Sequence, residues 1–194
     1  MSDSLLAFFG ISAAIINTVG LYPYIRDIFK RKTKPERATW WIWLALNIIA
    51  ISAQISAGFT WYIVLAVVQS VAVGLIAVLS LNYGYGTFKR RDVVSFVVAL
   101  FGLVLWNFTH SPITALLVVV LVDFAAFYPL LIKTWEAPHT ETLSTWVLAT
   151  ISSTLGVIAV GVVDITRLLY PIYIALGCIT MVVVILQRRP KQAN

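Results

Sequence analysis

Apolar stretches, most of them about as long as a membrane is thick, recur along almost the whole chain. Seven can be drawn, at residues 5–25, 38–56, 60–81, 93–108, 112–132, 143–163 and 168–187, with short polar segments between them. A helix needs about 20 apolar residues to cross about 30 Å of hydrocarbon. Because 60% of the residues are hydrophobic and 11% are charged, the pattern predicts an all-α integral membrane protein with seven transmembrane helices and no separate water-soluble domain.

Two parts of the chain repeat each other at a distance of 106 residues. This distance separates Pro23 from Pro129, and the Thr-Trp pair at Thr39 from the pair at Thr145. A repeat within an apolar chain is typical of transporters built from duplicated halves. We expect residues 1–81 and 112–187 to form two parallel three-helix bundles. A loop and a linker helix over 82–111 would join them (a 3+1+3 arrangement), and 188–194 would form a tail.

The basic residues predict the orientation of the chain in the membrane. With seven helices, every Lys and Arg except Arg167 falls on the same side as the C-terminus. Basic loops stay in the cytoplasm, so we expect a multi-pass protein of the cell membrane with its N-terminus outside and its C-terminus in the cytoplasm. The net charge of +6 is explained by this topology and by contact with anionic lipid, and it requires no nucleic-acid partner.

Asp123 is the one carboxylate expected well inside a span, about 16 Å along the helix that begins at Pro112. A charged side chain there costs at least about 2.5–3.5 kcal/mol, so it should face a cavity or a partner. Burial favours the protonated form, which suits proton transfer or cation binding. The equivalent residue in the first repeat is Asn17, which we expect at the same site. Alternatively, both residues only form hydrogen bonds that hold helices together.

Further polar residues are expected in the spans and could line the same cavity or, alternatively, only join neighbouring helices; they are Asn47, Gln54, Gln69 and Ser153.

Pro23 and Pro129 are expected inside helices, near their cytoplasmic ends, and Tyr22 and Tyr128 precede them. A proline removes one helical hydrogen bond, so the two positions are predicted to act as a hinge or gate; alternatively, they simply bend each helix. Trp40 and Trp43 are expected at the membrane interface, as anchors.

Several chemistries are excluded by the residues. No Lys lies within a predicted span, so a retinal Schiff base is not expected, and no glycine-rich phosphate loop or metal-spaced cluster occurs. The lone Cys178 excludes an intramolecular disulfide. We expect no metal, no cofactor and no enzymatic activity.

The segment from Gly10 through Leu21-Tyr22-Pro23-Tyr24 to Lys32-Thr33-Lys34 resembles the first helix of small SWEET-like sugar transporters. The order of the predicted helices is similar to that of the PQ-loop/SWEET-like (MtN3/saliva-type) superfamily. This resemblance implies two three-helix repeats, a linker helix and alternating access by rocking of the two bundles about the prolines. The chain departs from the family in having Pro23-Tyr24 and Pro129-Leu130 in place of Pro-Gln. Asp123 is similar to the intramembrane Asp of proton-coupled members.

Together these features predict a small secondary transporter or facilitator of a polar metabolite (a sugar, an amino acid or similar), coupled to H⁺ through Asp123. Its other expected partners are membrane lipid and, in a homo-oligomer, further copies of itself. The alternative is a non-transporting receptor or a ligand- or lipid-binding protein on the same fold, because a fold does not settle function.

Overall fold

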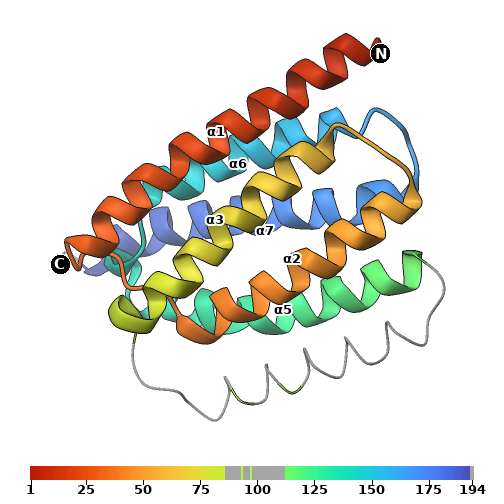
Figure 1. Cartoon of the computed structure of the whole chain (residues 1–194). Coiled ribbons are helices and arrows are strands. Elements are labelled where there is room, and N and C mark those ends of the chain that lie inside the picture. The colour runs from red at the N-terminus through yellow and green to blue at the C-terminus, as the bar shows by residue number, and fades with distance from the viewer. Residues whose placement is uncertain (86–92, 94–96, 98–111, 193–194) are drawn as a thin grey trace.

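The computed structural model describes residues 1–85, 93, 97 and 112–192, which form a set of long helices (Figure 1). The α-helices are α1 (Asp3–Phe29), α2 (Arg37–Ala57), α3 (Tyr62–Tyr83), α5 (Pro112–Glu136), α6 (Leu143–Ala159) and α7 (Ile165–Gln192). The short 3-10 helix η1 (Pro138–Thr140) precedes α6.

These helices form a closed ring. In the order α1, α3, α2, α5, α7, α6, each helix packs against the next, and α6 packs against α1 to close the ring. The first three helices and the last three have equivalent neighbours. If α1, α2 and α3 take the places of α5, α6 and α7, respectively, and the reverse, every contacting pair in the ring is still a contacting pair. We call the contacts of α1 with α6 and of α2 with α5 the two seams, because there α1–α3 meet α5–α7. We call the end where α1 and α5 finish the Glu141 end.

The predicted seven-helix 3+1+3 architecture is wrong. The described residues form six α-helices, and five of these are long and apolar enough to cross a membrane. Helix α6 has 17 residues and is too short, because the chain turns at Gly161, whose φ of +72° suits glycine and ends the helix. At 1.5 Å per residue it covers about 26 Å. The predicted linker helix at 93–108 lies almost entirely outside the described residues.

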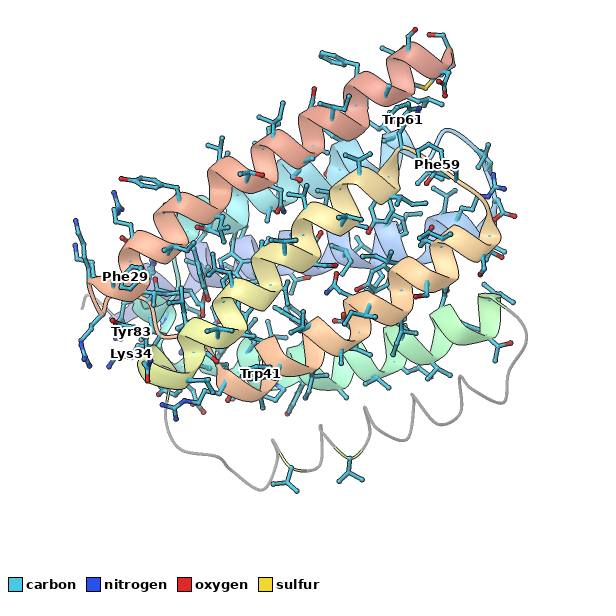
Figure 2. All side chains as sticks on the ribbon, viewed as in Figure 1. Phe29, Lys34, Trp41, Phe59, Trp61 and Tyr83 are labelled. Atoms are coloured by element: carbon cyan, nitrogen blue, oxygen red, sulfur yellow. The ribbon has the colours of Figure 1, made fainter. Side chains whose placement is uncertain are left out.

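The outer surface of the ring is apolar, as expected for contact with lipid. Figure 2 shows Phe59 and Trp61 at one end of the molecule and Phe29 and Tyr83 at the Glu141 end. Aromatic side chains at both ends are typical of the two membrane interfaces. Between them, large exposed apolar side chains cover the helices, among them Ile15, Val19, Val71, Val78, Leu121, Phe124, Leu176 and Val183. The structure is thus compatible with a multi-pass membrane protein.

Two equivalent hydrogen bonds cross the seams beside the prolines of α1 and α5. Thr39 Oγ1 on α2 donates to the carbonyl of Ala126 on α5 at 2.9 Å. Thr145 Oγ1 on α6 donates to the carbonyl of Gly20 on α1 at 3.0 Å. Each carbonyl lies three residues before a proline inside the helix. Because a proline disturbs the helical hydrogen bonds around it, a threonine from the next helix can satisfy the carbonyl there.

Alanine substitutions at two glycines test the close packing of α1 against the start of α3. A Cβ at Gly10 would lie 2.5 Å from the carbonyl oxygen of Trp61, whereas one at Gly177 would meet nothing within 4 Å. We expect Gly10→Ala to destabilise the protein by about 1–3 kcal/mol through overpacking. Gly177→Ala should be neutral or stabilising by about 0.5–1 kcal/mol. Melting temperatures of the two purified variants check this, and equal values would contradict the packing of α1.

Candidate functional site

A central cavity of about 120 Å³ lies inside the ring and is lined by residues of all six described α-helices. An apolar cavity of about 150 Å³ holds one benzene molecule, so a ligand of a few non-hydrogen atoms fits this one. The polar lining residues are Asn17, Asn47, Gln69, Asp123 and Thr145. The aromatic ones, which we call the aromatic wall, are Tyr24, Trp40, Trp43, Phe127, Trp146, Tyr170 and Tyr173.

Asp123 is the only acidic or basic residue among the described lining residues, and it lies midway along α5. Its side chain is 3% exposed. Two donors from other helices hold the same carboxylate oxygen: Trp43 Nε1 on α2 donates to Oδ1 at 3.0 Å, and the Tyr173 hydroxyl on α7 donates to it at 2.9 Å. These bonds stabilise negative charge on Asp123 and fix its position between three helices.

Ring contacts join most of the aromatic wall into two groups, one around Trp43 and one formed by Tyr170 and Tyr173. Trp43 is edge-on to Trp40 with centroids 5.1 Å apart, and it is stacked on Phe127 at 6.4 Å. Tyr24 contacts Trp40 at 5.5 Å. Tyr170 and Tyr173 are stacked at 6.3 Å. The rings come from both halves of the chain, so aromatic side chains line the cavity from α1, α2, α5, α6 and α7.

Two polar atoms of the aromatic wall are buried without a hydrogen bond to the described residues. They are Trp40 Nε1 and the Tyr170 hydroxyl, on side chains that are 6% and 3% exposed. Buried polar groups are usually satisfied by protein, water or ligand. The Tyr170 hydroxyl lies close to Asp123 and the Trp40 N–H close to Tyr24, so each atom can bond that neighbour or a molecule in the cavity.

The residues that the sequence predicted for this site fall into two groups. Asn17, Asn47, Gln69 and Asp123 line the cavity. Gln54 and Ser153 are buried but are not among its lining residues. Ser153 donates to the carbonyls of Ala149 and Thr150 on its own helix, and the Gln54 amide has no partner among the described residues. A polar side chain in a span thus need not face the cavity.

The tyrosines of the predicted gate point outward. Tyr22 is 70% exposed and Tyr128 is 56% exposed, so neither lies against the cavity. The prolines that follow them lie inside α1 and α5, as predicted. Any hinge at these positions would act through the helix backbone and not through the two tyrosine rings.

Trp40 and Trp43 were expected to be anchors at the membrane interface. They instead line the cavity. Their spacing from Asn47 places all three on one helix face, and this signal could have found them. Tyr170 and Tyr173 were missed altogether. They stand in the apolar run at residues 168–177 of α7, where aromatic residues do not stand out, so only the packing of α7 reveals their role.

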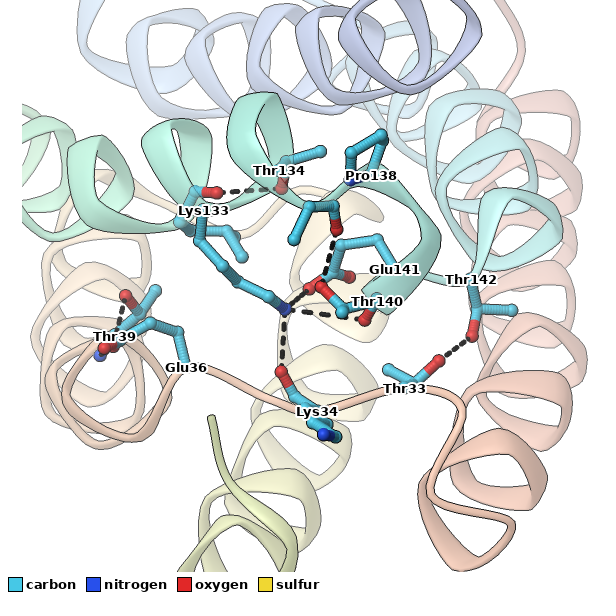
Figure 3. Close-up of polar contacts among 12 residues, drawn as sticks. Thr33, Lys34, Glu36, Thr39, Lys133, Thr134, Pro138, Thr140, Glu141 and Thr142 are labelled. Atoms are coloured by element: carbon cyan, nitrogen blue, oxygen red, sulfur yellow. Dashed lines mark hydrogen bonds and ion pairs between the residues drawn. The ribbon is translucent and has the colours of Figure 1, made fainter. Parts of the chain in front are cut away.

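A second polar cluster closes the Glu141 end of the ring (Figure 3). Lys133 and Glu141 form an ion pair whose side chains are both fully buried. Lys133 Nζ also donates to the carbonyl of Lys34 at 2.7 Å, which ties α5 to the segment after α1. The ring of Tyr85 lies 5.5 Å from Nζ. These contacts compensate two charges that burial alone would strongly destabilise.

The buried ion pair is linked to the aromatic wall through one carboxylate. Glu141 Oε2 accepts from Trp146 Nε1 at 3.0 Å and from the Tyr24 hydroxyl at 3.4 Å. Both of these side chains line the cavity. A movement of the Glu141 side chain would therefore shift two side chains that line the cavity, because both are hydrogen-bonded to it.

No group of three His, Cys, Asp or Glu residues able to hold a metal ion occurs in the described part of the chain. No protein-family model, curated protein or solved structure matches this chain. The cavity itself is therefore the main evidence for a function.

Burial of the ion pair predicts the effect of removing one partner. Glu141→Gln leaves Lys133 charged, buried and without a counter-ion, so we expect a loss of about 3–5 kcal/mol in stability. In the double variant Lys133→Met, Glu141→Gln the unpaired charge is gone, and most of the loss should be recovered. Thermal unfolding of the purified variants measures both effects.

The control is the exposed pair Arg26–Asp27, where Arg26 is 47% exposed. Arg26→Gln should change stability by less than about 1 kcal/mol. A similar small effect for Glu141→Gln would show that the buried pair contributes little.

Proposed function

We propose that this chain is a small secondary transporter or facilitator of a polar metabolite, with the central cavity as the substrate site and Asp123 as the group that links transport to protons. One observation carries the proposal: a buried carboxylate stands midway along a helix, in a cavity lined by both halves of the ring. Intramembrane carboxylates are costly and usually serve ion or proton pathways.

The charges support a multi-pass placement with the Glu141 end in the cytoplasm. Arg167 is the only Lys or Arg residue of the described chain away from that end; the others, such as Lys30, Lys34 and Arg188, lie at it. This asymmetry is the usual signature of orientation.

The two seams support alternating access. The ring divides into two sets of three helices with equivalent neighbours, and α1 and α5 each carry a proline at a seam. A rocking motion of one set against the other would open and close the cavity at the seams, with backbone changes at Pro23 and Pro129. The equivalent neighbours also favour an origin from duplicated halves, and the resemblance to SWEET-like carriers is part of the same proposal.

A receptor without transport is the second candidate, and the closed Glu141 end favours it. Separating a buried ion pair that makes several further hydrogen bonds is costly, so the Glu141 end would resist opening. A cavity that never opened at that end could bind a ligand but could not transport it.

Proteoliposomes loaded with a pH-sensitive dye test the proposal. We expect at least one metabolite of a panel of sugars, amino acids, nucleosides and amines to move protons with it in the wild type. Asp123→Asn removes the titratable group, so uptake should lose its dependence on the pH gradient. Asp164→Asn is the matched control, because it makes the same change at an exposed residue before α7.

Binding without uptake of any panel member would support the receptor. Uptake with equal pH dependence in the wild type and Asp123→Asn would remove Asp123 from the proton pathway.

Replacing the prolines tests the hinge. In Pro23→Ala and Pro129→Ala the missing helical hydrogen bond can form, which stiffens α1 and α5. We expect the uptake rate to fall several-fold, while the binding constant measured in detergent changes much less. Unchanged uptake in the double variant would contradict a hinge at these positions.

A further inference from the structure

The central cavity combines one carboxylate with seven aromatic side chains, and it contains no basic residue among its described lining residues. We propose that its ligand is a small organic cation, a substituted or quaternary ammonium without an anionic group. This inference rests on the proposed function only in taking the cavity as the substrate site; it names the class of substrate.

The electrostatics of the cavity favour a positive charge. The carboxylate of Asp123 is 3% exposed and its described bonds come from neutral donors, Trp43 and Tyr173. Such donors spread the negative charge but do not cancel it. A monovalent cation in the cavity would compensate it, whereas an anion would add a second negative charge in a poorly polarisable environment.

The aromatic wall selects among cations. Aromatic ring faces carry negative potential and attract ammonium groups, and cages of such rings are the usual way proteins bind quaternary ammonium compounds. Two aromatic side chains, Trp43 and Tyr173, bond the carboxylate directly. The rings of Trp40 and Phe127 pack against Trp43 and also line the cavity. A hydrated metal ion, by contrast, requires several oxygen ligands, and Asp123 is the only carboxylate among the described lining residues.

Size and polarity exclude larger or more polar ligands. A volume of about 120 Å³ is close to that of a cavity of about 150 Å³ that binds benzene, so the ligand is limited to roughly the size of benzene. A sugar would need a partner for each of its hydroxyls, but most of the wall is aromatic or aliphatic. The indole N–H of Trp40, which has no partner among the described residues, is available to a single hydroxyl on an ammonium ligand.

Choline and its neutral isostere 3,3-dimethylbutan-1-ol test the proposal, because they share a shape and differ in charge. Calorimetric titration of the full chain in the uncharged detergent dodecyl maltoside avoids surface attraction of the cation. We expect the wild type to bind choline roughly tenfold or more tightly than the isostere. This comparison needs no variant and does not depend on the folding of a mutant.

Variants then locate the site. Asp123→Asn should weaken choline binding by roughly tenfold or more and leave the isostere unchanged, and Trp43→Leu should also weaken choline binding. Asp164→Asn, with its exposed side chain, should behave as the wild type.

Equal binding of choline and the isostere would overturn the proposal, as would absence of binding for both choline and tetramethylammonium. Unchanged choline binding in Asp123→Asn would overturn it as well. If the wild type instead transports a neutral panel member in proteoliposomes, the inference on substrate class fails while the proposed function stands.

Discussion

A charge inside an apolar ring of helices has to be hydrogen-bonded or paired, and this constraint shapes both polar centres of the molecule. Midway along α5, Asp123 is held by donors from α2 and α7, so three helices must meet around it. At the Glu141 end, Lys133 and Glu141 neutralise each other, and Lys133 also bonds the segment after α1. Because an unpaired charge in either place would be costly, both centres define how the two halves come together.

Side chains of the aromatic wall connect the two polar centres. Trp146 and Tyr24 donate to Glu141 and also line the cavity that contains Asp123. The same rings therefore belong to the candidate ligand site and to the polar cluster at the Glu141 end. In the alternating-access cycle proposed above, a molecule that moves the rings would also change the bonding of the buried ion pair.

The polar positions of the spans could be partly predicted. Asp123 and Asn17 are equivalent by the 106-residue offset, and both line the cavity. Gln54 and Ser153 looked similar in sequence but do not line it, because a buried polar side chain can also bond its own helix, as Ser153 does. Trp40 and Trp43 were misread because tryptophan near a helix end is usual both at a membrane interface and in a binding cavity, and only their burial separates the two cases.

The sequence by itself determined the helical, membrane-compatible character of the chain, because length and apolarity are local properties. It also determined the depth of Asp123 and the equivalent placement of Pro23 and Pro129 in α1 and α5. Only the tertiary structure decided the order of helices around the ring and the early end of α6 at Ala159. It also decided the pairing of Lys133 with Glu141 and the convergence of aromatic rings from every described α-helix except α3 on one cavity. These features depend on contacts between residues far apart in the chain, and spacing along one helix does not encode them.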